Sequence, residues 1–473
     1  MKKRLILAVL AVASAFFAAA PAFASVQNVK VSGEIDNTWL VRDQFDLGTR
    51  SAGENYYQNL IFTQSHLHVD ADLTDNVSTT LGLINERAWG DDVDATNDMD
   101  IHLAYVTLRE MLYSPLTVII GRQAFAYGNS FVMDATGTNN NVASGGLNSV
   151  AEDFTQRTKL DSVRLVFDYN PLTVDVVAGK VTNGNLLGTG LQDDDVDLFG
   201  TNANWQLGDQ WNSVVEGYFW AKIDQSTKSA GVGKHADTVY MPGVHVSTSP
   251  IKGLNLQGEV AIQRGNKAET GGVLTTNDDN VARQAQAAQL VANYMLPFEQ
   301  TEKWSPVLTG VYTYVSGDND VNEEVNGTTP GTKARYTAWD PMFENQSGGT
   351  IYNTLFDLTN AHILTAKAAV KPIEDVTATL QWDSISLDRE LSDGDFNGNA
   401  DLLTLRQPDG GTAAARTTSK KGLGNEYGLG LVYDYTEDVQ FGAKYSIFKP
   451  GRAFHKDNRE RASQYIVNAN VKF

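Results

Sequence analysis

Along most of this chain, apolar and polar residues alternate one by one, in segments joined by connections that are short and long in turn. Alternation with a period of two places the two kinds of side chain on opposite faces of a β-strand. The pattern is clearest in residues 427–435 and 439–447, where the odd positions are apolar or aromatic. No run of about 20 apolar residues follows the first 24 residues, so no segment there predicts a membrane-spanning helix. A closed β-barrel is the other structure that satisfies every backbone polar group in a bilayer.

The order of the connections indicates the size of this barrel. Short connections rich in Asn, Asp, Gly and Pro, which suit tight hairpins, alternate with long polar ones. Bacterial barrels of one chain have even strand numbers, short periplasmic turns and long external loops. We therefore predict an all-β fold over residues 25–473. It is a single antiparallel transmembrane β-barrel of about 18 strands, with both termini in the periplasm.

The first 24 residues have the features of a secretory signal peptide. Three positive charges at residues 2–4 precede an apolar run, and Ala22-Phe23-Ala24 offers a cleavage site. Removal of residues 1–24 takes the formal charge from −20 to −23. The chain has no cysteine, which excludes disulfides and thiolate metal sites. An acidic chain without a basic stripe gives no support for nucleic-acid binding.

Two features favour the outer membrane of a Gram-negative bacterium. The last nine residues alternate and end on Phe473, which resembles the C-terminal signal that outer-membrane barrels present to their assembly machinery. Aromatic residues near the strand ends would form an interfacial girdle. They are Trp39, Tyr57, Tyr169, Trp205, Trp211, Tyr294, Tyr427 and Tyr435. The expected partners are outer-membrane lipids, lipopolysaccharide and the barrel assembly machinery.

A barrel of this size is wide enough for a water-filled channel, so its selectivity depends on the charges and loops in the lumen. The alternation places more acidic than basic residues on the lumen face, which does not choose between cations and anions. The candidate pore-lining cations are Arg122, Arg164, Lys222, Lys367 and Lys444. The strand of Arg122 is apolar on both faces, so its orientation stays open. Residues 129–158 are long enough either to fold into the barrel or to form an external flap.

Four short motifs are similar to those of a known family. Gly121-Arg122-Gln123 followed by Tyr127-Gly128 resembles the Gly-Arg-Gln plus Tyr-Gly signature of alginate-export barrels. The segment Leu160-Asp-Ser-Val-Arg164-Leu165 is similar to one of the family's strands. Residues 312–318 and 339–343 resemble its Ser-Gly-Asp strand end and its Phe-Asp-Pro-Leu-Phe loop.

The resemblance implies a monomeric outer-membrane channel for an anionic polysaccharide, with arginines at its constriction. Arg122 and Arg164 carry over by their motifs. We therefore expect a channel that passes an anionic polysaccharide or other small polar solutes by passive diffusion. The alternative is a surface-binding, adhesive barrel that uses its acidic loops and transports little. The acidic lumen departs from the favourable potential that a uronate polymer needs along its path.

Two segments contain possible metal ligands. Asp393, Asp395, Asn397, Asn399 and Asp401 have the spacing of an EF-hand calcium loop, but position 12 is a threonine. Solvated turn residues are the other interpretation of this run. His66 and His68 share one strand face and could bind zinc. No third ligand is visible beside them, so we interpret them as part of a hydrated lumen wall.

The sequence gives no support for an enzyme. A hydrolytic site in a barrel needs a nucleophile or an activated water beside an oriented base. Neither a Gly-x-Ser-x-Gly nor a His-Glu-x-x-His motif occurs, and the seven histidines are scattered. We predict no catalytic residues and no cofactor, apart from calcium in the external loop at residues 393–401.

Overall fold

The computed structural model describes most of the chain after the predicted signal peptide. The described residues are 28–49, 56–90, 99–136, 147, 150–182, 195–226, 236–268, 281–297, 304–318, 335–346, 351–390, 402–406 and 412–473. The predicted signal peptide and the predicted calcium loop, residues 1–24 and 393–401, lie outside them. Among the helices of the described part, none is long and apolar enough to cross a membrane.

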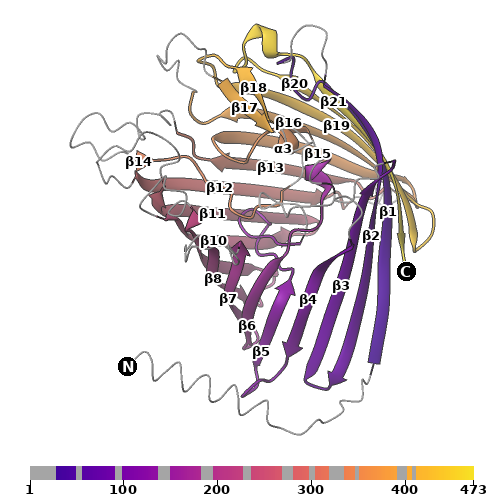
Figure 1. Cartoon of the computed structure of the whole chain (residues 1–473), viewed down its shortest axis with the longest axis vertical. Coiled ribbons are helices and arrows are strands. Elements are labelled where there is room, and N and C mark those ends of the chain that lie inside the picture. Colours follow the sequence, from indigo (N-terminus) through magenta and orange to yellow (C-terminus); the bar gives the residue numbers. More distant parts are fainter. Residues whose placement is uncertain are drawn as a thin grey trace, which may run out of the picture.

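The main sheet is a closed antiparallel barrel (Figure 1). It contains 19 strands, of which β14 is a two-residue segment that pairs in parallel with β12. The other 18 strands form the barrel wall, as the sequence predicts. The wall strands are β1 Asn28–Asp43, β2 Tyr57–Thr74, β3 Val77–Ala88, β4 Met99–Leu108, β5 Leu116–Gln123, β6 Leu160–Asp168, β7 Leu172–Thr182, β8 Val196–Gln206, β9 Val214–Asp224, β10 Asp237–Ile251, β11 Leu254–Lys267, β12 Val281–Met295, β13 Val307–Val315, β15 Ala361–Ile373, β16 Val376–Leu387, β19 Gly422–Asp434, β20 Val439–Pro450 and β21 Ala462–Lys472.

The first and last strands close the barrel. β1 pairs with β21 in a register that places Glu34 opposite Lys472 and Asp43 opposite Ser463. Beyond the last ladder pair, the amide of Gly33 donates to the carbonyl of Phe473 at 2.8 Å, and the amide of Phe473 donates back at 3.0 Å. β1 begins and β21 ends on the side of the short turns, because the strands alternate in direction around the wall.

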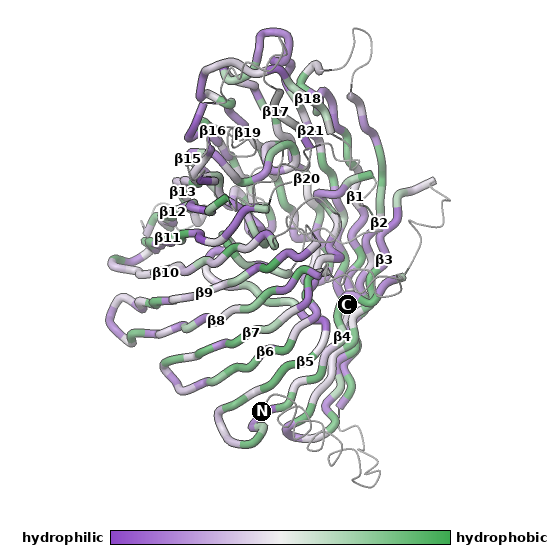
Figure 2. Tube along the Cα trace, turned by 60° about the vertical axis from the view of Figure 1, so that its left-hand side comes forward, coloured by the Kyte–Doolittle hydropathy of each residue, from purple (hydrophilic) through white to green (hydrophobic). Residues whose placement is uncertain are grey.

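Alternation along the strands separates a lumen face from an outer face, and Figure 2 shows polar and apolar residues in turn along many strands. The odd positions of β19 and β20, such as Leu429, Leu431 and Phe441, are exposed on the outside. The predicted girdle aromatics are also exposed, with the exception of the half-buried Tyr294. Because such side chains cover the wall from end to end, the outer surface is suited to lipid.

The remaining elements belong to the long connections. They are η3 Glu152–Phe154, β14 Arg335–Tyr336, α3 Ile351–Leu355, the hairpin of β17 Leu402–Arg406 and β18 Thr412–Arg416, and η5 Lys456–Asn458. The connection from β5 to β6 and the one from β13 to β15 fold into the barrel, where the strands surround α3 (Figure 1). The sequence allows residues 129–158 either to fold into the barrel or to form an external flap. The described residues of this segment fold into the barrel.

Candidate functional site in the barrel lumen

A layer of non-strand chain crosses the lumen. We use the name lumen layer for residues 124–136, 147, 150–159, 335–346 and 351–358. Its two connections join through backbone hydrogen bonds from Asp134 N to Phe343 O at 2.9 Å and from Asn345 N to Ser130 O at 2.9 Å. The rings of Phe131 and Trp339 stack with their centroids 6.1 Å apart. The apolar residues of the layer therefore pack in one cluster with apolar side chains of the barrel wall, such as Trp220 and Met241.

Charged residues of β1 and β3 hold one side of the lumen layer. The guanidinium of Arg42, which is fully buried, donates to the carboxylate of Asp153. Glu86 on β3 is also fully buried and accepts from the amide of Gln156 and the hydroxyl of Thr155, each at 2.7 Å. Arg157 lies 3.4 Å from the same carboxylate. Because a buried charge is costly unless it is paired, these contacts fix the layer to the wall.

Carboxylates on other strands of the wall hold the layer through its backbone. Glu216 and Glu259 accept from the amides of Gly128 and Asn129, at 3.2 and 3.3 Å. Glu426 on β19 accepts from the first amides of α3, including that of Tyr352 at 2.8 Å. A carboxylate at the start of a helix satisfies amides that have no partner within the helix. Many of the acidic lumen residues are therefore anchors of the layer.

Asp340 joins the layer to two cations of the wall. Its carboxylate lies 2.9 Å from Nζ of Lys222 and 3.8 Å from the guanidinium of Arg283. Burial alone would raise the pKa of Asp340, but these two cations outweigh it and lower the pKa to about 2. The side-chain amide of Gln263 donates to the Asp340 carbonyl at 2.7 Å and fixes the backbone at the same point.

These contacts assign different roles to the five predicted pore-lining cations. Arg164 pairs with Asp175, which also accepts from Tyr127 Oη at 2.6 Å, and Lys222 pairs with Asp340. Both cations face the lumen, and both are occupied with holding the layer. Sequence reasoning did not separate these anchoring cations from free ones. Asp175 is only 11 residues from Arg164, on the neighbouring strand, but Asp340 is 118 residues from Lys222, in a long connection.

Lys367 and Lys444 also face the lumen, on β15 and β20. Among the described residues, neither lysine has a carboxylate within ion-pair distance. Glu426 and Asp383 lie farther from Lys444 but still close enough to interact with its charge. Arg122 has a different position. Arg122 lies opposite Ala104 and Asp161 in the sheet, and Asp161 is on the same face of β6 as the exposed Val163. Arg122 is therefore on the outer face of the wall, apart from the lumen cations.

Two cavities lie on the two sides of the lumen layer. The long-loop cavity has a volume of about 400 Å³ and is lined by Lys267, Arg283 and Asp318 among others. The short-turn cavity has a volume of about 430 Å³. Its polar lining consists largely of side-chain amides, those of Asn129, Gln257, Gln289, Asn293, Gln346 and Asn353, with carboxylates from Glu344 and Asp383.

Tyr352 on α3 lines both cavities. Its side chain is 5 % exposed, and its hydroxyl makes no hydrogen bond to any of the described residues. A phenol that makes no hydrogen bond is held only by packing, here against Phe356 with a ring distance of 5.8 Å. Tyr352 therefore stands at the boundary between the two cavities. No pattern in the sequence pointed to Tyr352, because it lies in a long connection whose position could not be predicted.

Comparison with known proteins identifies relatives of this architecture. The family model described as alginate export matches residues 28–468, which confirms the resemblance drawn from the four motifs. The chain matches no curated protein sequence. Similar solved structures come from Pseudomonas aeruginosa and cover 95 % of this chain.

Three of these structures show the extent of the similarity. OpdQ is 13 % identical with a TM-score of 0.54 over 98 % of its own chain. OccK2 (OpdF), in complex with glucuronate, is 12 % identical with a TM-score of 0.51 over 99 %. OpdK, with vanillate, is 8 % identical with a TM-score of 0.54 over 100 %. At these identities the likeness establishes the fold alone.

Proposed function

Because the chain belongs to the alginate export family of outer-membrane β-barrels, we propose that it is a passive channel for small polar solutes rich in hydroxyl groups, including sugar acids. The observation that carries this proposal is the pair of cavities that meet at Tyr352. Tyr352 lines both cavities, and the proposed route past the lumen layer runs through them, beside this side chain. The route is narrow, because apolar residues of the layer pack against apolar residues of the wall beside it.

The lining of the short-turn cavity supports the class of solute. A side-chain amide offers both donors and an acceptor, so a ring of amides can bind hydroxyl groups in many orientations. A volume of about 430 Å³ lies within the range of small-molecule sites, about 300–1,000 Å³. OccK2, which has the same fold, binds glucuronate, a molecule of this class and size.

Lys367 and Lys444 support the inclusion of acids. They face the lumen next to Asp383, which lines the short-turn cavity. An ammonium group that has no carboxylate partner attracts a solute carboxylate and lowers the cost of its desolvation. Arg164 and Lys222 contribute less to this attraction, since their charges are neutralised by Asp175 and Asp340.

The family's description favours an anionic polysaccharide as a second candidate substrate. A linear polymer would have to pass Tyr352 one sugar at a time, or the lumen layer would have to move. We also propose that both termini and the short turns face the periplasm, as in other bacterial barrels. The long loops would then face outward and receive the solute first.

Conductance of the purified barrel in a planar bilayer tests the proposal. We expect Tyr352→Ala to raise the single-channel conductance severalfold, because it removes the side chain between the cavities. Tyr427→Ala, which removes an exposed tyrosine from the outer face of β19, is the matched control and should leave the conductance unchanged. Equal conductance of wild type and Tyr352→Ala would contradict the route. An absence of conductance in both would favour the adhesive, loop-binding alternative.

A further inference from the structure

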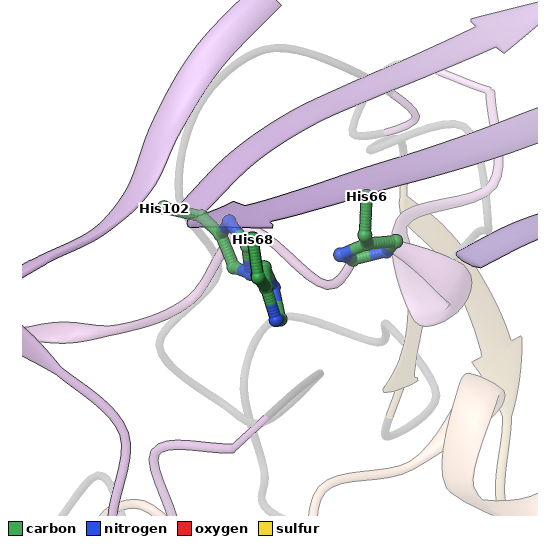
Figure 3. A group of neighbouring side chains, drawn as sticks. All are labelled: His66, His68 and His102. Atoms are coloured by element: carbon green, nitrogen blue, oxygen red, sulfur yellow. The ribbon is translucent and has the colours of Figure 1, made fainter. Parts of the chain in front are cut away.

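Three histidines from two strands meet on the lumen wall. His66 and His68 lie on β2, and His102 lies on β4, with β3 between them. One ring nitrogen of each lies within 4.8 Å of the others (Figure 3). From the sequence alone, we interpret His66 and His68 as part of a hydrated lumen wall, because no third ligand is visible beside them. His102 is that third ligand, brought close by the fold.

The backbone of β3 and β4 is shaped so that His102 can reach across β3. Gly82 on β3 lies opposite His68, and a Cβ at Gly82 would come within 2.8 Å of the His102 ring. The ladder between β3 and β4 shifts register directly after Gly82, which leaves His102 as an extra residue on β4. A bulge of this kind re-aims a side chain, and a glycine within a strand allows close approach.

The distances fit a tetrahedral ion. Two imidazole nitrogens bound to one Zn²⁺ at about 2.05 Å lie roughly 3.3 Å apart. Nε2 of His68 and Nε2 of His102 are 3.3 Å apart. His66 completes the group, with its ring centroid 5.1 Å from that of His102.

The ring nitrogens have few other partners. Nε2 of His66 is buried without a hydrogen bond among the described residues. Buried polar atoms normally have a partner, so each exception calls for a ligand, water or ion. Glu34 lies opposite His66 in the pairing of β1 with β2 and adds a negative charge on the same face.

We propose that His66, His68 and His102 form a site for a first-row divalent cation, with Zn²⁺ as the preferred ion. Three neutral imidazoles with an open fourth position are a common zinc donor set, and imidazole suits borderline-soft ions better than Ca²⁺ or Mg²⁺. The ion enters from the lumen, where His66 and His68 are half-buried. Once bound, it links β2 to β4 and adds two positive charges to an acidic stretch of wall. The site does not depend on the proposed solute.

Zn²⁺ titration of the purified full-length barrel, followed by calorimetry and by metal analysis after gel filtration, tests this proposal. We expect one tightly bound Zn²⁺ per chain. His68→Ala and His102→Ala should each weaken binding at least about tenfold, since each removes a ligand. His362→Ala is the matched control, because His362 lies on β15, away from the three histidines, and bonds to Tyr312 and Asp388. It should retain wild-type affinity.

Three results would overturn the site: no Zn²⁺ bound by the wild type, wild-type affinity in His68→Ala, or equal losses in His362→Ala. Migration of the unheated barrel on a denaturing gel shows whether each variant folds. Should a variant fail to fold, Co²⁺ added to the wild type gives an independent result. Strong visible absorption indicates a tetrahedral ion with nitrogen ligands and supports the site, whereas the weak spectrum of a six-coordinate ion overturns it.

Discussion

Glu86 offers the sharpest test of the idea that wall charges hold the lumen layer in place. Its buried carboxylate accepts from Thr155 and Gln156 of the layer and from Gln64 of β2, each at 2.7 Å. A hydrogen bond to a charged group is worth about 1.5–3 kcal/mol, and loss of one partner of a buried ion pair costs about 3–5 kcal/mol. Glu86→Ala removes three bonds to the layer, since the amide of Leu147 also donates to this carboxylate at 3.4 Å, and it removes the pairing with Arg157. The energies are not additive, so we take about 3–5 kcal/mol as the total.

A change of about 1.4 kcal/mol alters an equilibrium constant tenfold. The loss therefore increases the population of the detached layer by roughly a hundredfold to a few thousandfold. Trypsin measures that population, because Arg157 is 4 % exposed in the attached layer and becomes a cleavage site when the layer detaches. Proteolysis follows the equilibrium population when opening and closing are faster than cleavage. We therefore expect cleavage after Arg157 to accelerate by about a hundredfold or more, with larger and more frequent conductance steps.

Two further variants identify the cause. Glu86→Gln keeps the shape and one acceptor oxygen but removes the charge, so its cleavage rate should lie between those of wild type and Glu86→Ala. Asp434→Asn removes an exposed lumen carboxylate that bonds to Gln440 on the barrel wall, and it should be cleaved at the wild-type rate. Cleavage of Glu86→Ala at the wild-type rate, in a barrel shown to be folded, would refute the anchoring role.

Three other predictions follow from the lumen and the wall. The folded-state pKa of Asp340 is about 2, below its ordinary 3.8, so its ion pairs stabilise the fold above that ordinary value and are lost as pH falls through about 2. The unfolding midpoints of wild type and Asp340→Asn should therefore differ at pH 5 and converge near pH 2; a gap that persists at pH 2 would contradict this. Lys367→Gln with Lys444→Gln should shift the reversal potential in a salt gradient toward cations, whereas an unchanged potential would remove both lysines from the conduction path. Gly200→Ala should lower the free energy of unfolding by about 1–3 kcal/mol, because its Cβ would lie 1.9 Å from the Trp220 ring, while Gly217→Ala, with open space at the same point, should not.

The candidate sites were predictable in part, and the limit differs from residue to residue. Arg164 and Lys222 were placed on the lumen face because alternation along one strand decides the face. Asp175 lies only 11 residues from Arg164, on the next strand, whereas the pairing of Lys222 with Asp340 was not predictable, because it depends on where a long connection folds. The proposed zinc site shows the same limit, since His102 is 34 residues from His68 and reaches it through a bulge.

The sequence by itself determined the class of fold and the number of wall strands. Period-two alternation and the order of short and long connections are local properties, and a membrane leaves a chain with that pattern only the closed barrel. The tertiary structure alone decided what fills the lumen. Whether a connection folds inward depends on pairing its backbone and charges with groups on seven or more strands at once. No local sequence pattern encodes contacts with so many strands. The lumen layer, the two cavities at Tyr352 and the histidine cluster therefore form only when the barrel closes.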